Sequence, residues 1–342
     1  MGVPGTVGII ANPASGRDIR RLVAGATTVS DHDKVTMLRR LLQGLSVAGV
    51  ERLLVMPDQH GLARQALDTL AGEGHPVPPV EWLGMTCDGS AGDSTRAGAL
   101  LREAQAGCVL ILGGDGTARA VARSAGETPL LPLSTGTNNV LPSFTEATVA
   151  GLAAGAVARR QVCLQRTALR HKWLEVLTPG RLPDLALVDL ALLRGRFAGS
   201  KAVWEAEELR ELVVTRADPA TIGLSAIAGV LRPVAPEDSF GLAVTLDATS
   251  PRRVLAPFGP GLPLVVGIAA VREIRVGETV RLMAQVPSMV ALDGEREFGI
   301  AEGQVVEVRL RSDGPWIVDS SHVLREMVRL GLLERPWPSR GG

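Results

Sequence analysis

The chain has few of the residues that mark a disulfide scaffold, a metal site or a nucleic-acid surface. Its 342 residues include only Cys87, Cys108 and Cys163, too few and too far apart for a disulfide framework or a Cys-x-x-Cys metal site. Tyrosine is absent and aromatic residues make up 3% of the chain, so no platform for stacking nucleic-acid bases is expected. The thiols are typical of reduced, mostly buried cysteines in a cytoplasmic protein.

Neither sign of charge is in excess, because 36 lysine and arginine residues balance 36 aspartate and glutamate residues. We therefore expect no nucleic acid and no membrane as partners, and any attraction for phosphate must be local. No basic segment precedes an apolar stretch at the amino terminus, and the longest apolar run, residues 262–271, is about half of a bilayer span. The five histidines have no metal-like spacing, so no protein metal site is expected. The Ala-, Gly-, Leu- and Arg-rich composition is typical of a bacterial protein.

Strand and helix patterns alternate as far as residue 142. Apolar runs predict strands at 7–11, 52–56, 80–83, 108–112 and 130–133. Apolar residues at helical spacing predict helices between them, at 35–45, 63–70 and 97–106. Alternation of this kind predicts an α/β domain with a parallel sheet over residues 1–142.

After Pro142 the pattern changes to short apolar runs bounded by proline and glycine, such as the run at 185–193. These runs predict a β-rich, sandwich-like domain over residues 143–314, preceded by a helix at 146–154. An amphipathic helix is expected at 201–215. The segment 315–342, with a helix at 323–333, is expected to return toward the first domain. Two domains also follow from the length, since single cores stop growing near ~250–300 residues.

Residues 110–117, Leu-Ile-Leu-Gly-Gly-Asp-Gly-Thr, place one carboxylate among three glycines directly after a buried strand. Gly113, Gly114 and Gly116 supply a turn without β-carbons, so a polyphosphate can approach the amides at the start of the next helix, and Thr117 adds a hydroxyl. Asp115 cannot itself attract phosphate. It is the candidate to orient an acceptor hydroxyl, to take its proton, or to hold Mg²⁺. The alternative is a tight strand-to-helix turn in which Asp115 only starts the helix.

Two further polar loops follow predicted strands. The loop after 130–133 offers hydroxyls and amides for phosphate, ribose or base at Thr135, Gly136, Thr137, Asn138 and Asn139. The loop after 7–11 offers similar groups at Asn12, Pro13, Ser15 and Gly16. Because the carboxyl ends of parallel strands meet at one edge of a sheet, we expect all three loops to converge there.

Gly-Gly-Asp-Gly-Thr resembles the signature shared by NAD kinases, diacylglycerol and sphingosine kinases, and 6-phosphofructokinases. The other two loops resemble the nucleotide loops of the lipid-kinase and NAD-kinase branches. Residues 219–229 resemble a remodelled Thr-x-Thr-Gly-Ser-Thr-Ala-Tyr stretch of NAD kinases, in which Gly223 and Ser225 match. With Pro257–Leu262 and Leu292–Glu295, nearly the whole chain resembles the ATP-NAD kinase/AcoX-type family, whose members are often encoded with acetoin catabolism genes.

The resemblance implies an NAD kinase-like fold and ATP-dependent phosphorylation of NAD to NADP. ATP, Mg²⁺ and NAD would be the ligands of a cytoplasmic homo-oligomer. Asp115 would contact the acceptor ribose hydroxyl, the glycines around it and Thr117 would cradle phosphates, and Asn138 and Asn139 would position the nucleotide. Asp189, Gly223, Ser225 and Asp293 would contribute to the dinucleotide site from the second domain.

Two departures from NAD kinases keep other functions open. Ala186-Leu187-Val188-Asp189 keeps the acid of an Asn-Glu or Asn-Asp pair but has Val188 in place of the amide, at a position expected to face the adenosine pocket. Asp293-Gly294-Glu295 is closer to the Asp-Gly-Glu of lipid kinases, although Asp-Gly is also a good hairpin turn. The alternatives are a same-fold kinase for a lipid or small polyol and a non-catalytic nucleotide-binding protein linked to acetoin catabolism.

The chain contains no Gly-x-x-x-x-Gly-Lys-Ser/Thr motif. The lysine that a P-loop enzyme directs at phosphate must therefore be replaced by backbone amides, by Mg²⁺ or by an arginine that the sequence does not identify.

Overall fold

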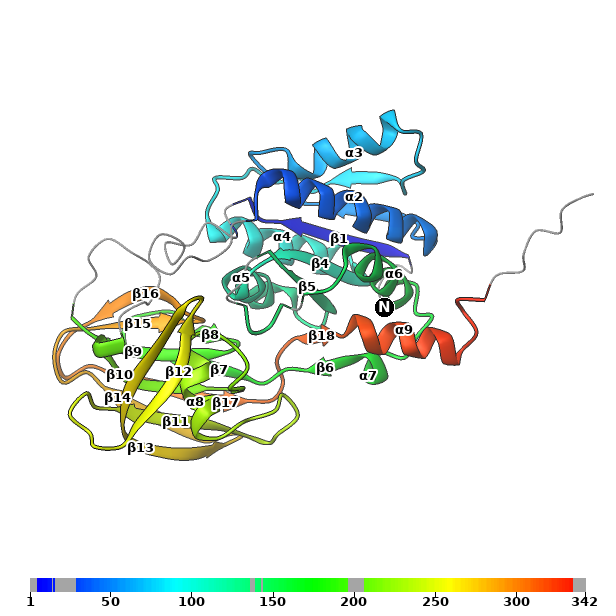
Figure 1. Cartoon of the computed structure of the whole chain (residues 1–342). Coiled ribbons are helices and arrows are strands. Elements are labelled where there is room, and N and C mark those ends of the chain that lie inside the picture. The colour runs from blue at the N-terminus through cyan, green and yellow to red at the C-terminus, as the bar shows by residue number, and fades with distance from the viewer. Residues whose placement is uncertain are drawn as a thin grey trace, which may run out of the picture.

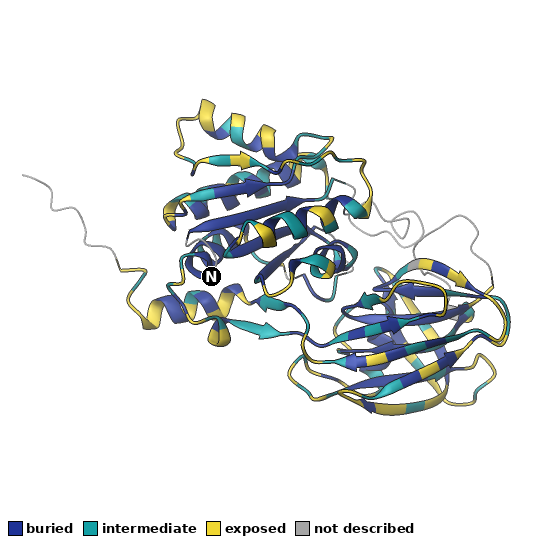
Figure 2. Ribbon diagram, turned by 180° about the vertical axis from the view of Figure 1, so that it is seen from behind, coloured by how far each residue is buried: buried dark blue, intermediate teal, exposed yellow. Residues whose placement is uncertain are grey.

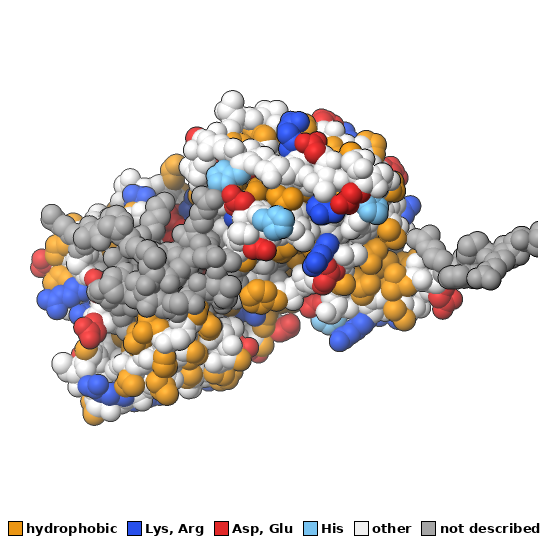
Figure 3. Space-filling model, turned by 45° about the horizontal axis from the view of Figure 1, so that its top comes forward, with side chains coloured by type: hydrophobic (Ala, Val, Ile, Leu, Met, Phe, Trp, Pro, Cys, Tyr) orange, Lys and Arg blue, Asp and Glu red, His pale blue; other side chains and the backbone are white. Residues whose placement is uncertain are grey.

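The computed structural model describes residues 5–13, 15, 29–135, 139–142, 144–195 and 206–334. A helix-flanked sheet and a β-rich sandwich form two bodies that lie side by side (Figure 1). No helix within the described ranges is long and apolar enough to cross a membrane. Acidic and basic side chains are interspersed on the face seen in Figure 3, in keeping with the balanced composition.

The first sheet has seven strands in the order β3-β2-β1-β4-β5-β18-β6. They are β1 (Thr6–Ala11), β2 (Arg52–Val55), β3 (Val80–Trp82), β4 (Cys108–Gly113), β5 (Leu130–Ser134), β6 (Ala168–Arg170) and β18 (Trp316–Val318). Pairing is parallel from β3 to β18, whereas β6 runs antiparallel to β18. β1 and β4 are buried along their whole length, as expected for parallel strands covered on both faces (Figure 2).

Helices cover both faces of this sheet because successive residues of its central strands point to opposite sides. One layer contains α2 (Asp31–Val47), α3 (Leu62–Gly72), α6 (Ala147–Ala158) and α9 (Ser320–Arg329), which share a core with Ile9 and Leu110. The other layer contains α4 (Ala91–Glu103) and α5 (Asp115–Ala125), which pack on Ile10 and Ile111. The short α7 (Leu164–Thr167) leads into β6.

The second body is built from two antiparallel sheets, in the strand orders β12-β13-β11-β10-β9-β15-β16 and β14-β17-β7-β8. Its strands are β7 (Trp173–Leu177), β8 (Asp184–Ala186), β9 (Asp189–Arg194), β10 (Leu209–Val214), β11 (Phe240–Leu246), β12 (Arg253–Gly259), β13 (Leu262–Arg275), β14 (Thr279–Met283), β15 (Ser288–Leu292), β16 (Glu295–Ile300) and β17 (Val305–Arg311). Leu190 and Leu192 of β9 enter the core between the sheets, whereas Ala191 and Leu193 pack on the side covered by α8 (Leu224–Leu231). This period-two alternation is the signature of strands with two buried faces.

The helix expected at 201–215 is wrong over its described part. Residues Ala206–Glu208 form one 3₁₀ turn, η1, and Leu209–Val214 form β10; residues 201–205 lie outside the described ranges. β10 pairs with β9 on one side and β11 on the other, and this pairing overrides the helical preference of Arg210 and Glu211. The single run expected at 185–193 is likewise two strands, β8 and β9.

The α/β body extends past the expected boundary at residue 142. Residues of α6 belong to its core, and β6 is a strand of its sheet, so the chain leaves this body after Arg170. It returns at Trp316 as β18, and α9 then packs on α6 and α7. The first domain is therefore made of two segments of the chain with the sandwich inserted between them.

Candidate functional site

The loops after β1, β4 and β5 meet at the carboxyl edge of the first sheet. Nδ2 of Asn12 donates a hydrogen bond to Oγ1 of Thr117 at 3.0 Å. The hydroxyl of Thr135 donates to Oγ of Ser15, also at 3.0 Å. Since the hydroxyl and amide groups of all three loops contact one another, they form one polar surface, as the topology of neighbouring parallel strands requires.

Gly114 and Gly116 allow side chains from elsewhere to approach the signature turn. A β-carbon on Gly114 would lie 2.8 Å from Oδ1 of Asn139, whose Nδ2 donates to Oγ of Ser134 at 2.7 Å. A β-carbon on Gly116 would lie 3.0 Å from Oε1 of Glu295. The turn is thus lined by an amide from the first domain and by a carboxylate from the second.

Asp115 is the first residue of α5 and its carboxylate is firmly held. Its two oxygens accept the backbone N–H groups of Val140 at 2.9 Å and Leu141 at 2.8 Å. The pKa of Asp115 is raised to about 6, mainly by burial and also by the nearby Asp293. The two amides and Arg216 oppose this rise. A carboxylate has about four lone-pair sites, so Asp115 can still accept a hydrogen bond from a ligand hydroxyl. A pKa near the working pH suits a general base.

Lys34 shapes the first loop from within. Its side chain is almost fully buried, and Nζ donates to the carbonyl oxygens of Pro13 and Ser15, each at 2.8 Å. Lys34 is not among the site residues expected from the sequence. A signal was available, because Lys34 stands in phase with Leu38 and Leu41 on the apolar face of α2.

The Asp-Gly pair of the second domain is a hairpin turn. Asp293 and Gly294 have φ angles of 49° and 77°, and Leu292 pairs with Glu295 on either side of them. Two residues with positive φ between paired strands form the type I′ loop for which Asp-Gly is a favoured sequence. The prediction that Asp293-Gly294 forms a hairpin turn is therefore confirmed for the backbone.

The Asp293 side chain has a second role, because it holds the start of β9. Its fully buried carboxylate accepts N–H groups from Leu187 at 3.0 Å, Val188 at 2.7 Å and Asp189 at 3.2 Å. Asp189 in turn accepts the N–H of Gly294 at 3.2 Å. Burial raises the pKa of Asp293, although Arg119 and the three amides oppose that shift.

Arg119 connects α5 to the second domain. It lies four residues after Asp115, and only 6% of its side chain is exposed. Its guanidinium faces three carboxylates of the second domain: Asp293 at 3.5 Å, Asp184 at 3.7 Å, and Glu297, to which it donates a hydrogen bond. Arg119 is not among the site residues expected from the sequence, because its three partners lie far along the chain.

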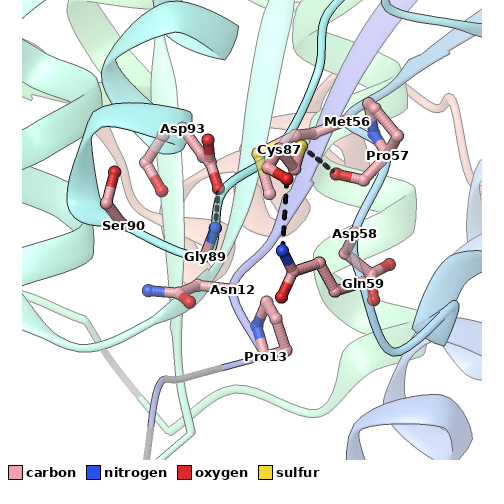
Figure 4. Close-up of a pocket in the computed structure, with 11 residues that line it drawn as sticks. Asn12, Pro13, Met56, Pro57, Asp58, Gln59, Cys87, Gly89, Ser90 and Asp93 are labelled. Atoms are coloured by element: carbon pink, nitrogen blue, oxygen red, sulfur yellow. Dashed lines mark hydrogen bonds between the residues drawn. The ribbon is translucent and has the colours of Figure 1, made fainter.

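A small hollow lies beside the first loop, at the carboxyl ends of β1, β2 and β3 (Figure 4). It is lined by Asn12, Pro13, Met56, Pro57, Asp58, Gln59, Cys87, Gly89, Ser90, Asp93 and Ser94. Gln59 donates to the carbonyl of Cys87 at 3.2 Å, and Asp93 accepts the N–H of Gly89 at 2.8 Å. The hollow has a mixed polar and apolar lining and shares Asn12 with the surface around Asp115.

Two family models match the chain, one for each domain. The ATP-NAD kinase N-terminal domain matches residues 7–161, and the acetoin catabolism protein X C-terminal domain matches residues 172–313. Acetoin catabolism protein X of Cupriavidus necator is 37% identical over 346 residues, which cover 98% of this chain and 96% of that protein. The chain belongs to the acetoin catabolism protein X family.

The fold of this acetoin catabolism protein X family member is NAD kinase-like. Yeast NADH kinase, solved in complex with NADH, aligns with a TM-score of 0.51 and 14% identity over 98% of this chain and 90% of that kinase. An identity this low shows the fold alone. The predicted fold class, a parallel α/β domain followed by a β-rich domain, is confirmed, and the chain carries the first domain of a kinase family.

Val188 does not face a nucleotide pocket, contrary to expectation. It is 1% exposed and packs with Ala118, Leu141 and Leu187 between α5 and the second domain. In this acetoin catabolism protein X family member the position of the NAD kinase amide is therefore part of an apolar contact.

Among the described residues, no hydrogen bond or ion pair joins the remaining predicted residues to Asp115. Gly223 precedes α8 with a φ of 120° and donates its N–H to the carbonyl of Pro257 at 3.1 Å. Ser225 is fully buried in the first turn of α8, and its hydroxyl has no partner in the described ranges. Gly16, Gly136, Thr137 and Asn138 lie outside the described residues.

Proposed function

We propose that this protein is a cytoplasmic, ATP-dependent kinase that phosphorylates NAD to NADP. The observation that carries the proposal is the position of Asp115, a buried carboxylate with a pKa of about 6 at the point where three polar loops meet. The match of residues 7–161 to the ATP-NAD kinase N-terminal domain supports it, as does the fold shared with a kinase solved with NADH.

In the proposed reaction Asp115 accepts the proton of the acceptor ribose hydroxyl. The hydroxyl oxygen forms a bond to the γ-phosphorus of ATP, the bond from that phosphorus to the bridging oxygen breaks, and ADP leaves. The amides at the start of α5 and the side chains of Asn12, Thr117 and Thr135 face the phosphates.

The hollow in Figure 4 supports a donor site in the first domain. Asn12 links it to the phosphate surface, so a donor bound on this side would meet Asp115 from the first domain. The acceptor then lies toward the second domain, where Asp189, Gly223, Ser225 and Asp293 remain its predicted contributors.

The described residues contain no cluster of three or more His, Cys, Asp or Glu side chains that could hold a metal ion. Magnesium usually binds through one or two carboxylates together with substrate phosphates, so a preformed protein site is not required. In this proposal Mg²⁺ arrives with ATP and neutralises the triphosphate.

A polyol or lipid acceptor is the second candidate, and Glu295 favours it. Its carboxyl group lies beside Gly116, so two carboxyl groups flank the start of α5. A second carboxylate would suit an acceptor with several hydroxyls, because each can donate a hydrogen bond.

The test is incubation with ATP and Mg²⁺ and, separately, NAD, NADH, diacylglycerol and acetoin-derived diols, with products read by mass. We expect NADP from NAD and none from the Asp115→Asn variant. A phosphorylated diol or lipid, with no NADP formed, would show that the acceptor is not NAD. Binding of nucleotide with no product from any acceptor would leave a non-catalytic nucleotide-binding protein.

A further inference from the structure

Arg216 is a cation whose charge acts on Asp115. Within the described part of the chain it makes no hydrogen bond and no ion pair. The neighbouring cations are engaged: Arg119 faces three carboxylates, and Lys172 donates to the carbonyl oxygens of Ala235 at 3.1 Å and Phe240 at 2.6 Å. A ligand group is therefore the contact that remains open to the guanidinium.

The backbone on both sides of Arg216 is fixed. Thr215 donates its hydroxyl to the carbonyl of Leu187 at 2.6 Å and its N–H to that of Val188 at 2.9 Å. Ala217 exchanges hydrogen bonds with Val234 at 3.0 and 2.8 Å. Arg216 thus stands directly after β10, beside the segment that Asp293 holds against α5.

The surroundings of Arg216 combine partial burial with nearby charge. Burial lowers the pKa of Arg216, and the carboxylates of Asp115, Asp218 and Glu237 raise it. None of them is close enough to form an ion pair, and the neighbouring His171 is uncharged at neutral pH because burial lowers its pKa to about 4. A half-buried guanidinium without hydrogen bonds is unfavourable, and phosphate oxygens would satisfy its planar fork of donors.

We propose that Arg216 binds the phosphate groups of the ligand opposite the amides at the start of α5. The chain has no P-loop motif and therefore lacks the lysine that P-loop enzymes direct at phosphate. Arg216 takes the place of that lysine. That the ligand is ATP rests on the proposed function. That the ligand carries phosphate groups rests on the surroundings of Arg216. Arg216, a residue of the second domain, then positions the phosphoryl group that is transferred.

The experiment compares wild type with Arg216→Gln, Arg216→Lys and Arg210→Gln by calorimetric titration in Mg²⁺. Arg210 is the matched control, because it lies on β10, just before Arg216, and within the described ranges its hydrogen bonds go to the carbonyl oxygens of Glu207 and Leu209, both at 2.8 Å. The probes are ATP, tripolyphosphate and adenosine. Melting temperatures confirm that each variant is folded.

We expect Arg216→Gln to weaken ATP and tripolyphosphate binding roughly ten- to hundredfold and to leave adenosine binding unchanged, because charge-assisted hydrogen bonds to phosphate are lost. Arg216→Lys should lose less, and Arg210→Gln should bind as wild type does. A folded Arg216→Gln variant with wild-type affinity for ATP and tripolyphosphate would overturn the proposal and leave the kinase function standing. If wild type binds tripolyphosphate through Arg216 but does not bind ATP, the phosphate site holds and the proposed function fails.

Discussion

Nε of Arg119 lies 3.5 Å from Oδ2 of Asp293, and this buried pair joins the helix that begins at Asp115 to a hairpin of the second domain. Asp293 also accepts three N–H groups at the start of β9. One arginine therefore fixes the acid, the hairpin and the strand relative to one another. The arrangement of the two domains around Asp115 depends on a side-chain contact as well as on the connecting strands.

Arg119→Met should lower the free energy of unfolding by about 3–5 kcal/mol, because it leaves the Asp293 carboxylate buried without a counter-charge. Combining it with Asp293→Asn should cost less than the sum of the two single changes. The measurement is urea unfolding. Arg123→Met is the control on the same helix, since Arg123 pairs with Asp184 but is 36% exposed and should cost under about 1 kcal/mol. Additive effects of Arg119 and Asp293 would contradict the coupling.

Asp115→Asn should reduce kcat at least ~10²-fold while leaving most of the affinity for nucleotide, because it removes the base and keeps the shape of the side chain. Steady-state kinetics on the true acceptor, with calorimetry for binding, measure both quantities. Asp319→Asn is a matched control, since Asp319 also stands at the start of a helix and accepts a backbone N–H, from His322 at 2.9 Å, but it caps α9. Near wild-type turnover in Asp115→Asn would remove the catalytic role.

The activity should rise with pH through about 6 and level off above it, because Asp115 acts as a base only when ionised and its pKa is about 6. Initial rates between pH 4.5 and 8 at saturating substrate give this profile. A rate independent of pH across that range would show that Asp115 ionisation does not limit the reaction.

The same shift predicts a dependence of stability on pH. The folded protein holds the Asp115 proton more tightly than the unfolded chain, so the contribution of Asp115 is present below the ordinary aspartate pKa of 3.8 and is lost as pH rises through about 6. Wild type should lose about 3 kcal/mol relative to Asp115→Asn across this interval, at 1.36 kcal/mol per pKa unit. If the difference in unfolding free energy between wild type and Asp115→Asn is the same at pH 4 and pH 7, the raised pKa is contradicted.

Gly114→Val should weaken nucleotide binding far more than it lowers the melting temperature. A β-carbon at this position meets Oδ1 of Asn139 at 2.8 Å, so the valine must push the Asn139 side chain away from the turn. Calorimetry with ATP and NAD, together with thermal unfolding, separates the two effects. Gly72→Ala serves as control, because a β-carbon on Gly72 has no described neighbour within 4 Å.

Val188→Asn should destabilise the protein by about 1–3 kcal/mol and should not improve NAD binding, because it places an amide in the apolar contact with Ala118 and Leu141. Urea unfolding and an NAD titration test the two parts. Val47→Asn is the exposed counterpart, with Val47 67% accessible, and should change stability little. Tighter NAD binding in Val188→Asn would restore the view that this position lines the adenosine pocket.

The three loops around Asp115 could be predicted because each has a local signature: an apolar strand followed by glycine, asparagine or threonine. The topology of parallel strands then brings them together, and the hydrogen bond between Asn12 and Thr117 is the result. Burial of Arg119 could not be predicted in this way. A cation in the first turns of a helix normally faces water, and only the folded second domain supplies Asp184, Asp293 and Glu297.

The strand at Leu209–Val214 was mispredicted for a related reason. Its glutamate and arginine favour a helix locally, but Leu212 and Val214 fill a core that includes residues of β9 and β11. The same limit applies to Val188, whose neighbour Ala118 lies on α5 in the other domain. Contacts between distant segments decided the outcome in each case.

The insertion of the sandwich between β6 and β18 determines the order in which the domains can be completed on the ribosome. Leu169 pairs with Ile317 where the chain leaves and re-enters the first sheet, and Val318, Val323 and Met327 belong to the first core. The sandwich strands, from Trp173 to Arg311, are contiguous and emerge before those residues. A nascent chain that ends before Trp316 therefore carries the strands of its sandwich, while β5 is still an open edge of the first sheet. The first domain, whose earlier strands emerge first, is then the last to be completed.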